Sequence, residues 1–159
     1  MRIVAASDHA GVELRREMAD EARLLGHEVT DLGPAPGEAV DYPVNGALVG
    51  RLVAAGEYDL GLLVCGTGVG ISIAANKVHG IRAVVCSEPF SAALSRRHND
   101  SNVLAVGARV VGPGLARMIT REWLTAEFEG GRHARRVQLI NDLDADREAD
   151  VLTPDRAVK

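Results

Sequence analysis

The most reactive group of residues in the chain is a thiol followed directly by a glycine-rich stretch. Cys65 ends an apolar run, and glycines then alternate with other residues at Gly66, Gly68 and Gly70. Glycines leave backbone N–H groups uncovered, so several of them can converge on an anion. Thr67 adds a hydroxyl, and a helix that begins after the loop adds a favourable field for negative charge. The pattern is typical of a site where a proton-transfer group lies beside a held negative charge.

Short apolar runs alternate with longer amphipathic stretches along the chain, which predicts alternating strands and helices. The expected strands span residues 2–7, 28–32, 60–64, 81–86 and 103–107. The expected helices span residues 14–25, 42–55, 71–77, 89–98 and 115–125, with a last one that includes 137–143. This order predicts a single-domain α/β fold, a Rossmann-like three-layer sandwich around a five-stranded parallel sheet. We expect the strand order 2-1-3-4-5.

In such sheets ligands bind beyond the carboxyl ends of the strands, at the switch point between strands 1 and 3. Strand 1 runs into Asp8 and His9, and strand 3 ends at the Cys65 loop. Tyr42 opens the helix after strand 2 and belongs to the same edge. An acid, an imidazole, a thiol and a glycine loop are therefore expected to share one crevice. Plainer roles stay open: Cys65 could be a small core residue, and Asp8 could cap the next helix.

A basic segment near the C-terminus offers a place for a phosphate group. Arg132 and Arg136 are four residues apart, so on a helix they project from one face, whereas Arg135 points elsewhere. Guanidinium groups bind phosphate in a forked geometry, and two on one face can clamp a dianion. Arg109, directly after strand 5, is a third candidate. The alternative is an exposed basic helix face without a ligand.

Composition narrows the classes of partner. The chain has 159 residues, of which 47% are hydrophobic, 25% are charged and 3% are aromatic, and its formal net charge is −4. Scarce aromatics and a negative charge argue against nucleic-acid binding. No apolar run approaches the ~20 residues needed to span a bilayer. Two cysteines without a secretory signal suggest free thiols in a reducing compartment, so we expect a cytoplasmic protein.

Other glycine-loop and metal-binding classes fit less well. A nucleotide-binding α/β module without catalysis stays as a distant alternative, because Glu88 follows Gly66 at about the distance of a ribose contact. However, Ile71 occupies the third glycine position of that fingerprint. No Gly-Lys-Ser/Thr follows the glycines, and no His or Cys pair has the spacing of zinc ligands. We therefore expect neither a metal nor a cofactor.

Five motifs, in order along the chain, resemble the type B ribose-5-phosphate isomerases. They are Ser7-Asp8-His9-Ala10-Gly11, Asp41-Tyr42-Pro43, the stretch from Cys65-Gly-Thr-Gly-Val-Gly to Asn76-Lys77, Arg97-His98-Asn99-Asp100, and Glu129-Gly-Gly-Arg-His133. The likeness implies a sugar-phosphate isomerase domain over residues 1–147, with a C-terminal tail at 148–159. It also implies interconversion of ribose 5-phosphate and ribulose 5-phosphate through an enediolate, in the pentose phosphate pathway. Allose 6-phosphate, galactose 6-phosphate and four-carbon ketose phosphates stay open, because the family also includes isomerases of these sugars.

The resemblance assigns roles to individual residues. Cys65 matches the base that moves a proton between C1 and C2, and His98, helped by Asp8, matches the group that opens the sugar ring. Thr67 and the loop Gly66–Gly70 match the site that holds the enediolate oxygens. The matching phosphate ligands are His9, Arg109, Arg132 and Arg136, and the matching contacts to sugar hydroxyls are Tyr42 and Asn99.

Two further expectations come from the resemblance and the topology. Some members use a glutamate base where this chain has Ile71, so the chain is expected to belong to the cysteine branch. Cys65 lies at the carboxyl end of strand 3, whereas His98 lies near the end of the helix that runs back from strand 4. About ten helical residues cover roughly 15 Å, so the two side chains should lie at opposite ends of one subunit. We therefore expect a homodimer with shared sites, or a dimer of dimers.

Overall fold

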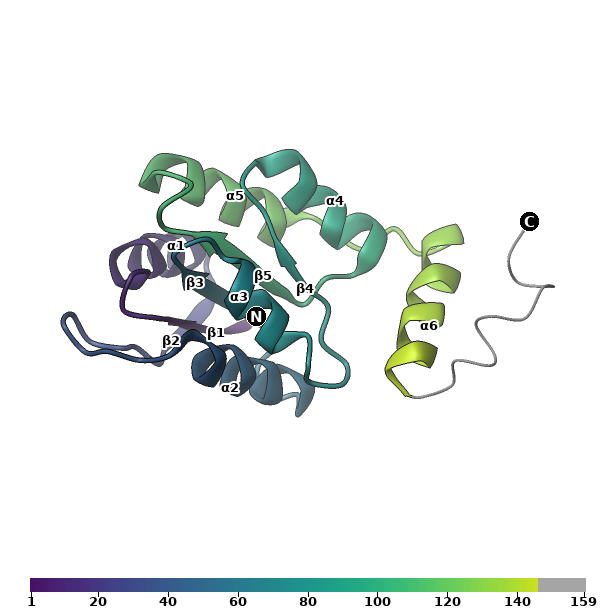
Figure 1. Ribbon diagram of the computed structural model, residues 1–159. Coiled ribbons are helices and arrows are strands. Elements are labelled where there is room, and N and C mark those ends of the chain that lie inside the picture. Colours follow the sequence, from purple (N-terminus) through teal and green to yellow (C-terminus); the bar gives the residue numbers. More distant parts are fainter. Residues whose placement is uncertain (146–159) are drawn as a thin grey trace.

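The computed structural model describes residues 1–145, in which five strands alternate with six helices (Figure 1). The strands are β1 (Arg2–Ser7), β2 (Glu28–Asp31), β3 (Leu60–Cys65), β4 (Ala83–Val85) and β5 (Val103–Gly107). The helices are α1 (Val12–Leu24), α2 (Tyr42–Ala54), α3 (Val69–Ala75), α4 (Pro89–Asn99), α5 (Pro113–Thr125) and α6 (Arg132–Asp144). The expected domain boundary at residue 147 and the tail at 148–159 lie outside the described residues.

The five strands form one parallel sheet in the order β2-β1-β3-β5-β4. The prediction of an α/β fold with a five-stranded parallel sheet is therefore confirmed. The predicted order 2-1-3-4-5 is wrong in its last two strands, because β5 lies between β3 and β4. The neighbourhood of β1 and β3, on which the expected crevice depends, is as predicted.

Burial explains why β5 takes the inner place. All five residues of β5 are buried, as expected for a strand covered on both faces. The strand β4 has only three residues and is partly exposed, with Val85 44% accessible. Short, half-buried strands suit a sheet edge, where one side has no partner. The expected strand 81–86 is shorter in the structure because the Asn102 side chain, rather than the ladder, accepts the Arg82 N–H.

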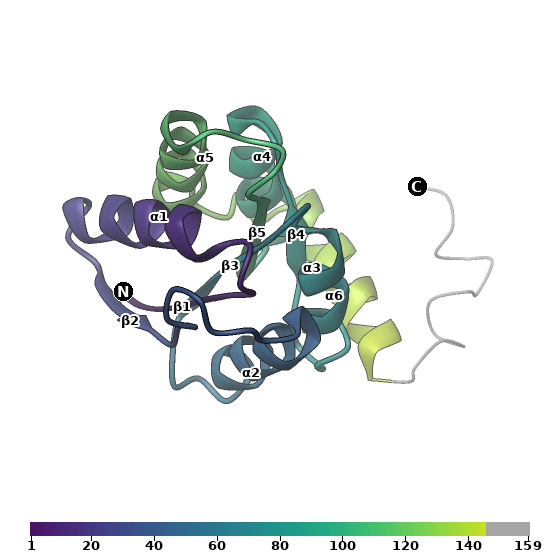
Figure 2. The same ribbon diagram turned by 60° about the vertical axis from the view of Figure 1, so that its left-hand side comes forward.

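The strand order decides which helices share a face. Right-handed crossovers place a connecting helix on one face when the chain moves outward and on the other when it returns. The step from β4 back to β5 therefore puts α4 on the same side as α1 and α5. The helices α2 and α3 pack together on the opposite side (Figure 1; Figure 2).

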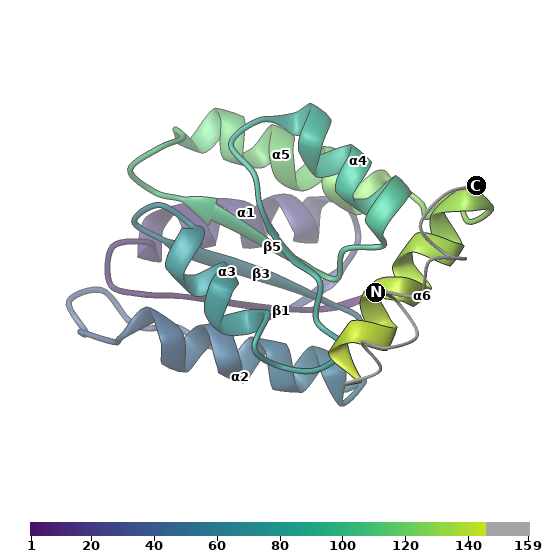
Figure 3. The same ribbon diagram turned by 45° about the vertical axis from the view of Figure 1, so that its right-hand side comes forward.

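Apolar residues of the central strands fill the two helix–sheet layers. Helix residues pack against them from both sides: Met18 of α1 and Trp123 of α5 are fully buried in one layer, and Val49 of α2 and Ile71 of α3 are fully buried in the other. The last helix, α6, lies beyond the end of α4, outside the sandwich (Figure 3). None of the helices in residues 1–145 is long and apolar enough to cross a membrane.

Candidate active site

A cavity of about 440 Å³ opens at the carboxyl ends of β1, β3 and β5. Its lining residues are Asp8, His9, Ala10, Tyr42, Cys65, Gly66, Thr67, Val69, Gly70 and Arg109. The acid, imidazole, thiol and glycine loop therefore share one crevice, as their places in the sequence predict. Arg109 joins them because β5 is the neighbour of β3.

The thiol of Cys65 lies at the base of the glycine loop. Cys65 is the last residue of β3 and is 4% accessible. Its Sγ accepts a hydrogen bond of 3.1 Å from the N–H of Gly68. Gly68 has φ = +78°, a conformation that strongly favours glycine, and it directly precedes α3. The Gly68 N–H is thus directed at the sulfur, the atom through which a cysteine acts as a base or nucleophile.

Close backbone contacts hold the loop in place. Gly107 pairs in register with Cys65, and a Cβ at Gly107 would lie 2.7 Å from the carbonyl carbon and oxygen of Thr67. A Cβ at Gly70 would likewise lie 2.7 Å from Cε2 of Tyr42. The glycines at these positions are therefore needed for close approach. The loop has little room to move toward β5 or toward Tyr42.

Asp8 is buried and held by the turn that follows β1. Its Oδ1 accepts hydrogen bonds from the N–H groups of Ala10 at 2.9 Å and Gly11 at 3.1 Å. The residue before α1 is Gly11, which has no side chain to cap the helix. Asp8 therefore orders the turn, while its side chain stays on the wall of the cavity.

Two buried side chains behind this wall belong to none of the sequence motifs. Asn45, on α2, donates a 2.6 Å hydrogen bond to the carbonyl of Ser7. Arg15, on α1, donates to the Ser7 hydroxyl at 2.8 Å and forms an ion pair of 2.9 Å with Asp31. Both fix the end of β1 and thereby the position of Asp8. Their role depends on tertiary contacts that span up to 38 positions in the sequence.

The remaining predicted site residues lie outside the cavity lining. His98 and Asn99 form the last turn of α4, and Arg132 and Arg136 lie on the first two turns of α6. The helix α4 has 11 residues, which corresponds to a length of about 16 Å from the cavity edge of the sheet toward the opposite edge. The expected separation within one chain is therefore present.

A compact group of charged and aromatic side chains surrounds His98. Its ring is stacked on that of His133, with centroids 4.1 Å apart. Glu129 Oε2 lies 3.7 Å from Nε2 of His98 and 3.9 Å from Nε2 of His133. Arg132 Nε donates a 3.3 Å hydrogen bond to Nε2 of His133. Burial, followed by the positive charges of His98 and Arg132, lowers the pKa of His133.

His133 and Glu129 were not singled out as functional residues in the sequence. Glu129 lies in the segment before α6 and His133 in the first turn of that helix, and Gly130 and Gly131, both with positive φ, turn the chain between them. With His98, Glu129 and His133 form a group whose possible metal-binding atoms lie within 4.8 Å of one another. Parallel stacked rings do not direct their nitrogen lone pairs toward a common point, however, and Arg132 occupies Nε2 of His133. The arrangement suits ring stacking better than coordination.

Cys86 and Glu88 have structural roles. Burial, with a further contribution from Glu88, raises the pKa of Cys86 to about 11, so its thiol stays protonated at neutral pH. The Glu88 carboxylate accepts hydrogen bonds from the N–H groups of Phe90 and Ser91 and caps α4. These bonds use the carboxylate that a nucleotide-binding module would direct to a ribose.

Comparison with known proteins assigns the chain to one family. The sequence profile described as Ribose/Galactose Isomerase matches residues 3–140. The chain belongs to this family. It is 54% identical over 146 residues to "Ribose-5-phosphate isomerase B" of Escherichia coli (strain K12), covering 92% of this chain and 98% of that protein.

Solved structures agree with this assignment. A ribose-5-phosphate isomerase B from Clostridium thermocellum superposes with a TM-score of 0.89 at 52% identity, covering 92% of this chain and 99% of that one. The Mycoplasma genitalium ribose-5-phosphate isomerase B, solved with bound ribulose-5-phosphate, gives a TM-score of 0.85 at 38% identity. That match covers 91% of this chain and 97% of the other.

Proposed function

We propose that this protein interconverts ribose 5-phosphate and ribulose 5-phosphate in the pentose phosphate pathway. The observation that carries the proposal is the Cys65 thiol, which lies at the base of a cavity and is hydrogen-bonded by the glycine loop. Family membership and 54% identity to "Ribose-5-phosphate isomerase B" support the choice of reaction and of a five-carbon substrate. The reaction moves a hydrogen within one molecule, so it needs neither a redox cofactor nor a metal.

Cys65 is the proposed base, which places the chain in the cysteine branch of the family. Its thiolate removes the proton from C2 of the open aldose, and the electron pair moves through the C1–C2 bond to O1. A proton then passes from the C2 hydroxyl to O1, which leaves the negative charge on O2. The enediolate takes the proton back at C1 from the Cys65 thiol, and the C2 oxygen becomes the ketone. Thr67 and the N–H groups of the loop Gly66–Gly70 are placed to hold the enediolate oxygens. Such donors stabilise charge most where the site is fixed before reaction.

The other groups open the sugar ring or bind the sugar phosphate in this proposal. His98, with Asp8, exchanges protons with O1 and the ring oxygen when the furanose opens. Tyr42 and Asn99 contact sugar hydroxyls. The proposed phosphate ligands are His9, Arg109, Arg132 and Arg136. A pair of guanidinium groups one helical turn apart suits a dianionic phosphate.

A homodimer with shared sites follows if these groups act on one sugar. The cavity lining includes Cys65 but neither His98 nor Arg132, and α4 separates the two ends of the subunit. A two-fold axis brings the α4 end of one subunit to the cavity of the other, twice over. Exposed apolar side chains on α2 and α3, including Val44 at 62% and Ile73 at 54%, support an interface beside the cavity.

The substrate is tested with a panel of sugar phosphates followed by proton NMR in D2O. Ribose 5-phosphate should react faster than allose 6-phosphate, galactose 6-phosphate and erythrose 4-phosphate. Cys65→Ala should lower turnover by about 10²–10⁴-fold, because a positioned base contributes that much. Cys86→Ala, which also removes a buried thiol, should retain turnover. Retention of more than about a tenth of the activity in folded Cys65→Ala would refute the assignment of the base.

The shared site is tested by complementation between two inactive variants. When Cys65→Ala and His98→Ala chains are unfolded and refolded together, half the dimers formed by random pairing contain one chain of each kind. Each mixed dimer has one intact site of two, so about a quarter of the wild-type activity should return. If mixed dimers form and no activity returns, the site is built within a single chain.

A further inference from the structure

His98 lies flat against a second imidazole that no proposed step uses. The two rings are 4.1 Å apart between centroids, and their planes differ by 1°. His133 is 6% accessible, whereas a third of the His98 side chain is exposed. The buried ring therefore supports one face of the accessible ring and leaves the edge of His98 open to a ligand.

A hydrogen bond at the edge of the His133 ring holds that ring in turn. Arg132 donates to its Nε2, and a nitrogen that accepts a hydrogen bond carries no proton, so the His133 proton is on Nδ1. Burial and the neighbouring positive groups also lower the pKa of His133, which favours the neutral form of the ring that stacks on His98. The charged groups that face this pair are Glu129, Arg132 and Arg136.

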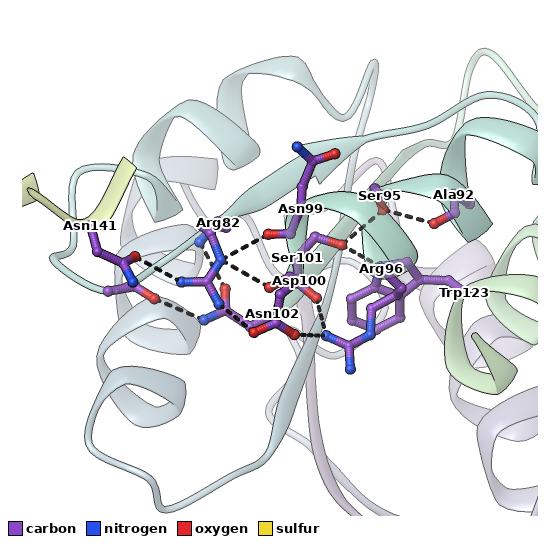
Figure 4. A network of polar contacts seen from close by, with 11 residues as sticks. Arg82, Ala92, Ser95, Arg96, Asn99, Asp100, Ser101, Asn102, Trp123 and Asn141 are labelled. Atoms are coloured by element: carbon purple, nitrogen blue, oxygen red, sulfur yellow. Dashed lines mark hydrogen bonds and ion pairs between the residues drawn. The ribbon is translucent and has the colours of Figure 1, made fainter. Parts of the chain in front are cut away.

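Two further contacts fix the elements that carry the rings. The N–H of Glu129 donates to the carbonyl of Arg97 at 3.0 Å, which ties the segment before α6 to α4. Arg82 donates to the carbonyls of Asn99 and Asp100, forms an ion pair of 3.1 Å with Asp100, and donates to Asn141 of α6 at 3.2 Å (Figure 4). The end of α4 and the helix α6 are thus held together at two places.

We propose that His133 is a positioning residue for ring opening, because its stacked ring sets the orientation of the His98 imidazole. This inference depends on the proposed function. Opening the furanose breaks the C1–O4 bond, removes the proton from the C1 hydroxyl and adds a proton to O4. Each transfer needs a ring nitrogen in line with an oxygen, so a free rotation of the imidazole would lower the rate. The stack restricts that rotation.

The inference predicts different effects on cyclic and acyclic substrates. Ribose 5-phosphate is a furanose and needs ring opening. Ribulose 5-phosphate is acyclic, because the C5 oxygen that would close its ring carries the phosphate. Deuterium exchange at C1 of ribulose 5-phosphate in D2O therefore reports on the base and the enediolate alone, whereas turnover of ribose 5-phosphate reports on ring opening as well.

The test compares His133→Ala with His133→Phe, which keeps a flat ring. His133→Ala should lower kcat for ribose 5-phosphate by about 10–100-fold, while C1 exchange of ribulose 5-phosphate changes less than about twofold. His133→Phe should retain ribose 5-phosphate turnover within a few-fold of the wild type.

Several results would overturn the inference. An equal loss in both reactions, with a raised KM for both sugars, would show that His133 acts through Arg132 and phosphate binding. Unchanged turnover in His133→Ala would show that His98 needs no support. Loss of ribose 5-phosphate turnover in folded His133→Phe equal to that in His133→Ala would exclude the flat ring as the cause. Failure of the wild-type protein in both reactions would instead refute the proposed function.

Discussion

Gly107→Ala, a substitution on β5, is expected to displace the glycine loop that follows Cys65 and so to lower activity. Gly107 ends β5 and pairs with Cys65, and its Cα faces the backbone of Thr67. The added Cβ would lie 2.7 Å from the carbonyl carbon and oxygen of Thr67, where ordinary contacts begin at 3.4 Å. The added Cβ is fixed to the strand, and the atoms that it meets are backbone atoms of Thr67. No side-chain rotation can therefore relieve the contact. The loop and the strand must move apart by about 0.7 Å.

The size of this shift sets the expected loss of activity. A misplacement of about 1 Å in a catalytic group can cost about 10²-fold, so we expect kcat to fall by about 10–100-fold. Inserting a methyl group into a close-packed region also destabilises a fold by about 1–3 kcal/mol. The substitution should therefore affect turnover more strongly than it affects the folded fraction at ambient temperature.

The assay pairs turnover of ribose 5-phosphate with denaturant unfolding. Gly112→Ala is the matched control, because a Cβ at Gly112 meets nothing within 4 Å and its φ of −81° suits alanine. The control should keep both activity and stability near wild-type values. If folded Gly107→Ala keeps more than half of the wild-type kcat, the loop tolerates the shift and its rigid placement is not needed for catalysis.

Two further predictions concern the arginines and the second cysteine. Arg132→Ala and Arg136→Ala should each weaken the binding of ribose 5-phosphate more than the binding of free ribose. The control Arg135→Ala should not show this difference. Equal losses of affinity for both sugars would contradict a phosphate clamp. The unfolded chain ionises Cys86 above its ordinary pKa of about 8.5, whereas the folded protein does so only near a pKa of about 11. Stability should therefore fall as pH rises between these values, and Cys86→Ala should lessen that fall in unfolding curves at about pH 8 and about pH 10.

The cavity could be predicted from the sequence because it depends on local signals and one adjacency. Apolar runs ended by Asp8 and by Cys65 indicate two strands whose carboxyl ends carry reactive groups. In a parallel sheet those ends meet at one edge, and a switch point lies between the first and third strands. The pairing of Ser7 with Val64 confirms this adjacency.

The places of the last two strands could not be obtained from local patterns in the same way. Both predicted segments are apolar. Exchanging the places of the last two strands in the sheet changes none of the sequence patterns that predict helices and strands. Tertiary fit distinguishes them. Only a glycine at position 107 allows the close approach to Thr67, and Val103 packs beside Gly61 with its methyl group 3.1 Å from the place of a Cβ.

The error in strand order leaves the inferred division of the site intact, for a reason that lies in the geometry of α/β units. Every helix that follows a parallel strand begins at the carboxyl edge of the sheet and runs back toward the amino edge. The start of α4, at Pro89, therefore lies near the cavity edge, and its end, at His98, lies away from it, whichever side of β5 the strand β4 occupies. Position along such a helix, rather than strand order, decides which side chains can share a cavity within one chain. The proposal that Cys65 and His98 act on one sugar therefore requires that the two residues come from different subunits.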